Sequence, residues 1–415
     1  MNYQTYWLKN VKIESGFKWE NGQAVRTETE TVHLFISHGK IEKITNTLAD
    51  ITNDYPLKDV KGLLLMPSFI EKHVHLDKTY MGDKWQSCLP ASSVIERCNI
   101  EKNILKSLPS QTHVRAGKLL KQLLSFGSTH VRTHVDIYPE VGLKNLEEVQ
   151  RAIQNFSDQM SVESVAFAQH GLLNKDTISY MRQAVKHGAG IVGSVDPATV
   201  DNNIEASLVQ LMDIAVEGNA DIDLHLHDPG HLGTFTMKRL AHLTLEAGWQ
   251  GRVFISHAFG LGGVSLDEVK KTAELLKAAE ISIVTSLPTG RDIPPVDFLD
   301  EYGIQVAIGN DNIFDSWWPT GNGDILERAT RLIERYRWTN EISLSQILKY
   351  ITGGITTLDR NGHQQWPKTG DSANFLFMDA SCSAEVIARR IKPNGVMYKG
   401  NIVYGELCIE EPVND

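Results

Sequence analysis

The fold is decided by the stretch Ser68-Phe69-Ile70-Glu71-Lys72-His73-Val74-His75-Leu76-Asp77. Its apolar and β-branched residues predict a strand, but the end of that strand is polar. His73 and His75 are two residues apart, so both side chains point to the same side of the strand. A strand in a protein core normally carries Val or Leu at such positions, which makes this strand end a candidate site.

Seven further runs repeat this layout of an apolar segment with a polar end. They span 128–136, 164–170, 191–197, 221–227, 252–259, 281–288 and 305–311. From the second run onward they recur about every 30 residues, the length of one strand–helix unit. Residues 203–217 and 266–279 have helical apolar spacing, and Gly188 and Gly248 are typical helix ends. The sequence therefore predicts an α/β fold, a (β/α)8 TIM barrel.

The two ends of the chain have a different pattern. Residues 31–44 predict a hairpin that turns at His38-Gly39, and residues 396–404 predict another that turns at Gly400-Asn401. Neither end is long enough to form a stable domain by itself. We therefore expect one small β-sandwich domain built from both chain termini, 1–66 plus 367–415, with the barrel in 67–366. The first strand is followed by an unusually long segment, 78–108, which we expect to be a lid or substrate loop.

Composition excludes several classes of protein. The chain has 415 residues, 41 Lys and Arg against 51 Asp and Glu, and a formal net charge of −10. The acidic balance argues against nucleic acid or an anionic membrane as partner. We find neither a signal-peptide pattern nor an apolar run of about 18 residues that would span a membrane. Four cysteines without CxxC spacing predict free thiols and a cytoplasmic location: Cys88, Cys98, Cys382 and Cys408.

Metal-ligating residue types recur at the predicted strand ends. Strand two ends in His134 and Asp136, strand five in His225 and His227, strand six in His257 and strand eight in Asp311. Active sites of barrel enzymes lie at this face. Nitrogen and carboxylate ligands suit zinc or iron, and such an ion acidifies its bound water. We predict one divalent metal ion per chain, zinc or iron, held by His73, His75, His225 and Asp311.

Several segments resemble the amidohydrolase superfamily, and more closely its cytosine deaminase-like branch. They are residues 66–78, 133–136, 165–169, 193–199 and 309–315. Within that branch, His225-Leu226-His227-Asp228, Asp311-Asn312-Ile313 and Gly321-Asn322-Gly323-Asp324 resemble the N-isopropylammelide isopropylaminohydrolase group. The resemblance implies a barrel with a small sandwich, one metal, a homo-oligomer, and hydrolysis at a ring carbon that expels an amine.

The resemblance also implies roles for individual residues. His73, His75, His225 and Asp311 match the metal ligands, and Asp311 can take the water proton while it ligates. His257 matches a histidine that contacts the metal-bound hydroxide. Gln169 matches a glutamine that, in cytosine deaminases, recognises the ring amide of the substrate. Cytosine deaminases carry Glu three residues after the strand-five ligand, where this chain has Asp228. Either His227 or Asp228 can therefore be the acid/base that protonates the leaving nitrogen.

The remaining candidates would bind substrate. Lys78 can anchor a carbonyl or carboxylate or form an ion pair, and Trp317 can stack on a flat ring or pack in its loop. Asp196 and Asp315 can hold ring N–H groups, and Asn312 belongs to the resembling motif. We predict a metal-dependent hydrolytic deaminase of a small N-heterocycle, a cytosine-like pyrimidine or an ammelide-like s-triazine. The alternatives are ring-opening hydrolysis of a cyclic amide and a non-catalytic scaffold.

Overall fold

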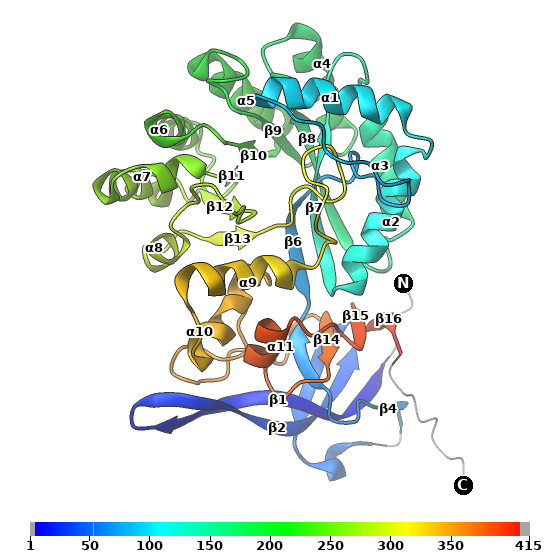
Figure 1. Cartoon of the computed structure of the whole chain (residues 1–415). Coiled ribbons are helices and arrows are strands. Elements are labelled where there is room, and N and C mark those ends of the chain that lie inside the picture. The colour runs from blue at the N-terminus through cyan, green and yellow to red at the C-terminus, as the bar shows by residue number, and fades with distance from the viewer. Residues whose placement is uncertain (1–4, 53, 407–415) are drawn as a thin grey trace.

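The computed structural model describes residues 5–52 and 54–406. Its upper part in Figure 1 is a parallel barrel surrounded by helices. The barrel strands pair in chain order: β6 (Phe69–Val74), β7 (Ser128–Asp136), β8 (Ser161–Ala168), β9 (Ile191–Ser194), β10 (Asp221–His225), β11 (Val253–Ser256), β12 (Ser282–Thr285) and β13 (Val306–Ile308). A parallel bridge between Val74 and Asp311 joins the last strand's end to the first strand. The predicted eight-stranded barrel is confirmed.

A helix covers the barrel between successive strands. These helices are α2 (Thr112–Ser125), α3 (Lys144–Gln154), α4 (Lys175–Lys186), α5 (Ile204–Gly218), α6 (Gly230–Ala247), α7 (Leu266–Ala278), α8 (Val296–Glu301) and, after β13, α9 (Ile325–Tyr336). The two helices predicted from apolar spacing are α5 and α7. Ser265 caps α7 by accepting a hydrogen bond from the backbone N–H of Glu268, and Gly248 ends α6 in a left-handed conformation.

Most barrel strands are shorter than the sequence predicted at their carboxyl ends. β12, for example, ends at Thr285, whereas the prediction ran to residue 288. The polar residues beyond the strands leave the sheet because the backbone turns toward the barrel mouth. His257 and Asp311 illustrate this, since both have positive φ angles, 71° and 64°. Such conformations are uncommon for residues other than glycine and concentrate at functional sites.

A second sheet contains strands from both ends of the chain. They are β1 (Tyr6–Glu20), β2 (Gln23–Ser37), β3 (Lys40–Thr45), β4 (Leu57–Asp59), β5 (Leu64–Pro67), β14 (Phe375–Met378), β15 (Gly395–Tyr398) and β16 (Asn401–Gly405). β5 pairs antiparallel with β14, so the two ends share one sheet with its own apolar core. The β2–β3 and β15–β16 hairpins are as predicted, and the long β1–β2 hairpin was missed. The exact domain boundaries stay a prediction.

The other helices lie at the two ends of the barrel. α1 (Val94–Ser107) occupies the long segment 78–108, and Figure 1 shows it near the barrel mouth. α10 (Glu341–Gln346) and α11 (Ser383–Arg389) lie between the barrel and the second sheet. Short 3-10 turns complete the fold: η1 (Leu48–Asp50), η2 (Phe259–Gly263) and η3 (Ile347–Tyr350). Among the residues described, no helix is both long and apolar enough to cross a bilayer.

Three of the four cysteines fall within the described residues. Cys88, Cys98 and Cys382 are free thiols, as predicted. Cys408 lies outside the described residues.

Candidate active site

Histidines and one aspartate gather at the carboxyl ends of the barrel strands. His73 lies near the end of β6 with His75 just after it, and His225 ends β10. His257 follows β11, and Asp311 follows β13. The four histidines are buried, each with 1–3% of its surface exposed. The predicted ligand positions therefore lie together at the face where barrel enzymes hold their active sites.

The ligand atoms fall into two candidate ligand sets that share His73: His73, His75, His134 and His225 form one, and His73, His257 and Asp311 form the other. Nε2 of His73 lies 3.5 Å from Oδ1 of Asp311, and Nε2 of His75 lies 3.3 Å from the same oxygen. The ring centroids of His73 and His225 are 4.5 Å apart. Ligand atoms of His73, His257 and Asp311 all lie within 4.8 Å of one another. This spacing suits a divalent ion with nitrogen and oxygen ligands.

Buried ring nitrogens without hydrogen-bond partners also fit a metal. They are Nε2 of His73, Nδ1 of His75, and both ring nitrogens of His225 and of His257. Buried polar atoms are normally bonded, so this concentration indicates a group that the rings would hold together. Nδ1 of His73 lies 2.8 Å from Oγ of Ser256, which donates to Asp223, and this contact orients Nε2 toward Asp311. The residues present therefore fit a divalent metal ion.

Burial favours the neutral form of His75 and His225, which is the form of histidine that binds metals. Burial lowers the pKa of His225 well below its usual value, and the neighbouring His134 lowers it further. The pKa of His75 is likewise well below its usual value, because of burial and then the charge of Lys78. Neutral rings have a free nitrogen lone pair at neutral pH.

His134 belongs to the same cluster. The sequence analysis placed this residue at the end of strand two but did not include it among the predicted metal ligands. It is fully buried, its ring centroid lies 4.1 Å from that of His73, and it forms a second candidate ligand set with His73, His75 and His225. Nε2 of His134 lies 3.5 Å from Oδ2 of Asp223. The available signal was its place on strand two, two residues before Asp136, at the same depth as the histidines of strand one.

His227 faces the cavity, whereas Asp228 turns aside. Nδ1 of His227 lies 2.9 Å from Oδ2 of Asp196, and its backbone N–H donates to the other oxygen of that carboxylate. The ring stacks on His257, with centroids 4.3 Å apart. Burial alone would lower the pKa of His227, but the Asp196 carboxylate outweighs burial and raises it. Asp228 instead accepts a hydrogen bond from the hydroxyl of Thr199.

Lys78 and Gln169 form a buried cluster with Glu101, a residue that sequence reasoning missed. Nζ of Lys78 donates to Oε1 of Gln169 and lies 3.0 Å from Asp136 and 3.5 Å from Glu101. Nε2 of Gln169 donates to Glu101 over 2.6 Å. Burial alone would lower the pKa of Lys78, but the Asp136 and Glu101 carboxylates outweigh burial and raise it. Glu101 lies on α1, so this cluster fastens α1 to the barrel.

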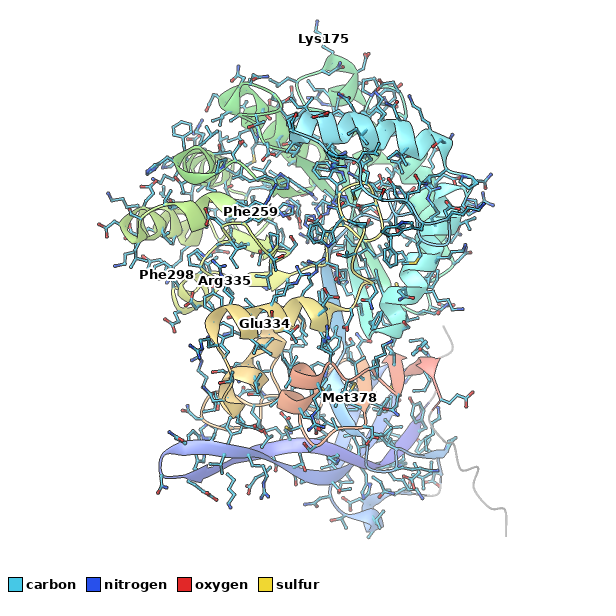
Figure 2. The ribbon with its side chains drawn as sticks, viewed as in Figure 1. Lys175, Phe259, Phe298, Glu334, Arg335 and Met378 are labelled. Carbon is cyan, nitrogen blue, oxygen red and sulfur yellow. The ribbon has the colours of Figure 1, made fainter. Side chains whose placement is uncertain are left out.

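A cavity of about 480 Å³ opens beside the metal-ligand candidates. His227, His257 and Asp311 line it together with Phe259, which is labelled in Figure 2. Residues 91–94 and 97, at and just before the start of α1, also line it. The predicted role of 78–108 as a lid stays a prediction, although this segment does border the cavity.

The six predicted substrate-binding residues fall into two groups. Asn312 and Trp317 line the cavity, and Nε1 of Trp317 donates to Glu101 over 2.7 Å. Lys78, Gln169, Asp196 and Asp315 are bonded mainly to other protein groups. Oδ1 of Asp315 accepts the backbone N–H groups of Trp317 and Trp318, each over 2.9 Å, which shapes the loop after β13. In the structure these four residues support the cavity wall.

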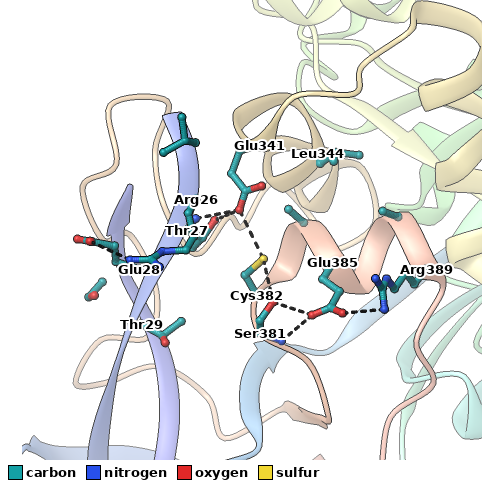
Figure 3. A pocket seen from close by; sticks show the side chains of 14 residues that line it. Arg26, Thr27, Glu28, Thr29, Glu341, Leu344, Ser381, Cys382, Glu385 and Arg389 are labelled. Carbon is teal, nitrogen blue, oxygen red and sulfur yellow. Dashed lines mark hydrogen bonds and ion pairs between the residues drawn. The ribbon is translucent and has the colours of Figure 1, made fainter. Parts of the chain in front are cut away.

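A larger depression lies far from this chemistry. Figure 3 shows it between β2, α10 and α11, with a volume of about 790 Å³. Its lining includes Thr27, Glu341 and Cys382, and Oε1 of Glu341 accepts from the backbone N–H and hydroxyl of Thr27. It lacks the convergent histidines of the barrel mouth, so the smaller cavity is the candidate active site.

Comparison with known proteins places this architecture in a family. The model of the amidohydrolase family Amidohydro_3 matches residues 102–404. The chain belongs to the amidohydrolase family. This amidohydrolase is 36% identical over 407 residues to the uncharacterized protein YahJ of Escherichia coli K12, covering 97% of this chain and 88% of that protein. It is 33% identical over 306 residues to an N-isopropylammelide isopropyl amidohydrolase of Pseudomonas sp. strain ADP. The match covers 71% of this chain and 74% of that protein.

Solved structures agree with the fold of this amidohydrolase. N-isopropylammelide isopropylaminohydrolase from Burkholderia multivorans superposes with a TM-score of 0.86 at 26% identity, covering 98% of this chain and all of that one. 5-Methylcytosine deaminase from Klebsiella pneumoniae superposes with a TM-score of 0.79 at 24% identity, and the superposition covers 96% of this chain and 97% of that one. The predicted superfamily and branch are confirmed, and the chain is a hydrolase of a superfamily that generally binds a divalent metal.

Proposed function

We propose that this amidohydrolase is a hydrolytic deaminase of a small N-heterocycle, which replaces a ring amino or alkylamino group by an oxo group. One observation carries the proposal: unpartnered ring nitrogens of the buried His73 and His257 lie within 4.8 Å of a carboxylate oxygen of Asp311, and His257 and Asp311 line a cavity of about 480 Å³. The proposed substrates are an ammelide-like s-triazine or a cytosine-like pyrimidine. The similarity to a protein named for N-isopropylammelide hydrolysis supports this choice.

His73, His75, His225 and Asp311 would hold one divalent ion, zinc or iron. Bound there, the ion would act as a Lewis acid and lower the pKa of a water molecule toward neutrality. In this proposal, the carboxylate of Asp311 would accept a proton from the attacking water. His257 is neutral and buried beside Asp311, and it can orient the attacking oxygen by hydrogen bonding.

The leaving nitrogen needs a proton because an amide-like nitrogen is a poor anion to expel. We propose that His227 delivers this proton. Its ring lines the cavity and stacks on His257, while Asp196 fixes its Nδ1 and leaves Nε2 for the substrate. In the balanced reaction, water adds to the ring carbon, the carbon–nitrogen bond breaks, and the amine leaves with a proton from His227. Asp228, the other candidate, is bonded to Thr199 outside the cavity lining.

We propose that Trp317 and Asn312 contact the heterocycle. Both line the cavity, and the indole of Trp317 is fixed by Glu101. Lys78 and Gln169 would shape the same site by holding Glu101 and hence α1. Asp196 and Asp315 would position His227 and the loop after β13. The cytoplasmic location and the homo-oligomeric state expected from the sequence stay predictions.

The test combines metal analysis of the purified protein with a screen for released ammonia or amine. The panel contains cytosine, 5-methylcytosine, ammelide and N-isopropylammelide. We expect about one zinc or iron per chain and amine release from at least one compound. His225→Ala should lose metal and activity together, whereas His242→Ala, which changes an exposed histidine of α6, should keep both. Metal without amine release from the whole panel would favour ring opening, and failure to bind either metal would contradict the proposed site.

A further inference from the structure

The cavity that His227 and His257 line is also lined by four arginines. Arg97 on α1, Arg291 in the loop after β12, and Arg328 and Arg331 on α9 all line it. Within the described part of the chain, Asp311 supplies the one carboxylate of the lining. The chain as a whole has a formal net charge of −10. A cluster of four arginines in an acidic protein is therefore local to this cavity.

Arg328 is the most informative of the four because it is buried without a carboxylate partner. It is 4% exposed, and its donors reach the side-chain oxygen of Asn310 at 3.4 Å and the carbonyl oxygen of Ser286 at 3.2 Å. Both acceptors are neutral, and Nη2 has no acceptor among the described residues. Burial lowers its pKa to about 10, so the guanidinium is still charged at neutral pH.

The neighbouring arginines leave further donors available. Arg291 is exposed and forms no ion pair with the described residues, and its guanidinium lies 5.7 Å from the centroid of the Phe259 ring. Arg97 donates to the carbonyl oxygen of Ser316 over 2.7 Å. Arg331 differs, because a carboxylate oxygen of Glu327 lies 3.0 Å from its Nη2. Among the described residues, Arg331 is thus the one of the four that pairs with a carboxylate. Asp311, Glu327 and Glu71 favour the charged form of Arg328 from nearby, but none of them forms an ion pair with it.

We propose that the substrate is a planar heterocycle with an anionic, oxygen-bearing edge, and that Arg328 and Arg291 bind this edge. The inference rests on the proposed deaminase function and narrows its substrate class. Burying a guanidinium whose contacts are all neutral is unfavourable, and an anionic ligand in contact with Arg328 would offset this cost. The planar fork of arginine matches two coplanar oxygens, and its charge strengthens each hydrogen bond. The anion is either a carboxylate substituent or an ionised ring imide, and both offer this edge.

The test measures binding of three probes to the metal-loaded enzyme by calorimetry. Uracil is neutral, orotate is the same ring with a carboxylate, and cyanurate has an ionisable ring imide. None of the three carries an amine to lose, so they report binding apart from turnover. We expect orotate or cyanurate to bind at least about 10-fold more tightly than uracil, as charge-assisted hydrogen bonds imply. Tighter binding of orotate would indicate a carboxylate substituent, and tighter binding of cyanurate would indicate an ionised ring imide. Higher salt should weaken the binding of the preferred probe but not the binding of uracil.

Variants decide whether the arginines cause this preference. Arg291→Gln and Arg328→Gln should each reduce the preference about 10-fold. Arg151→Gln, which changes an exposed arginine of α3, should leave it intact. Arg291 is exposed, so its variant remains decisive if loss of the buried Arg328 prevents folding. Equal affinities for all three probes in the unmodified enzyme would overturn the inference, and so would a preference that survives both variants.

The same data separate this inference from the proposed function. Amine release from neutral substrates, with no preference for anionic probes, would retain the deaminase and reject the anionic substrate. Arginine-dependent binding of orotate or cyanurate, with no amine release from any compound of the panel, would retain the anion site and reject the deaminase.

Discussion

The backbone N–H of Asp311 donates to the carbonyl oxygen of His73 over 2.6 Å, across the seam where the barrel closes. One residue follows the last strand and the other lies in the first, so closure of the barrel brings two candidate metal ligands together. Oε1 of Glu71 reinforces the seam by accepting the backbone N–H groups of His73 and Asn310. Assembly of the candidate metal site therefore depends on barrel closure.

Gly309 provides the space for this seam, which leads to the first prediction. A Cβ at this position would stand 2.5 Å from Cβ of His73 and 2.6 Å from its backbone nitrogen. We expect Gly309→Ala to displace His73, lower bound metal well below one per chain, and destabilise the fold by roughly 1–3 kcal/mol, as overpacking does. Gly190→Ala is the matched control, since a Cβ there has open space. Unchanged metal content and melting temperature in Gly309→Ala would disprove the role of the seam.

A second prediction separates the two candidate proton donors. His227→Gln removes the ring that lines the cavity, so we expect kcat to fall by roughly 10²–10⁴-fold, the usual contribution of general acid catalysis. Bound metal should persist, because His227 is outside the candidate ligand sets. Asp228→Asn is the comparison, and its kcat should fall much less. The measurement is kcat together with metal content, and the opposite ranking of the two variants would assign the proton transfer to Asp228.

A third prediction concerns the attachment of α1. Glu101 accepts hydrogen bonds from Gln169 and Trp317 and lies 3.5 Å from Lys78. Glu101→Gln removes its charge from this buried cluster, and charge-assisted hydrogen bonds contribute about 1.5–3 kcal/mol each. We expect KM to rise about 10-fold with a smaller change in kcat, and residues 84–95 to be cleaved faster in limited proteolysis. Glu147→Gln on α3 should change neither, and wild-type KM in Glu101→Gln would refute the attachment.

A fourth prediction tests stability at the opposite end of the barrel. Glu163, near the start of β8, contacts Arg132 at 2.9 Å and both His130 and Lys72 at 3.4 Å. Burial alone would raise its pKa, but His130 and Arg132 outweigh burial and lower it. A carboxyl whose folded pKa is depressed stabilises the fold above its unfolded pKa, and loses this effect as pH falls through the folded value.

Glu163→Gln should therefore lower the melting temperature at pH 7 by about 1–3 °C. The difference from wild type should shrink as pH falls below about 4, where the unfolded carboxyl becomes protonated. Melting curves between pH 3 and pH 7 give the measurement. A difference that grows toward acid pH would contradict the assigned sign.

The sequence by itself determined the barrel, the shared sheet of the two chain ends, and the strand-end histidines. These features are local: strands and helices have their own periodicity, and a residue at a strand's carboxyl end faces the barrel mouth whatever surrounds it. His73, His75, His225 and Asp311 could therefore be predicted together. The ends of the strands could not, because the backbone turns there are set by tertiary contacts.

Only the tertiary structure decided which side chains share the cavity. His134 joins the histidine cluster through its depth in the barrel, and Glu101 reaches the site from a helix outside the barrel repeat. Arg291 and Arg328 line the same cavity although they come from segments with no shared motif. The structure also distinguished His227 from Asp228, which adjoin in sequence but turn to different neighbours. Such relations depend on side-chain direction and on contacts distant in the chain, and neither is encoded by local pattern.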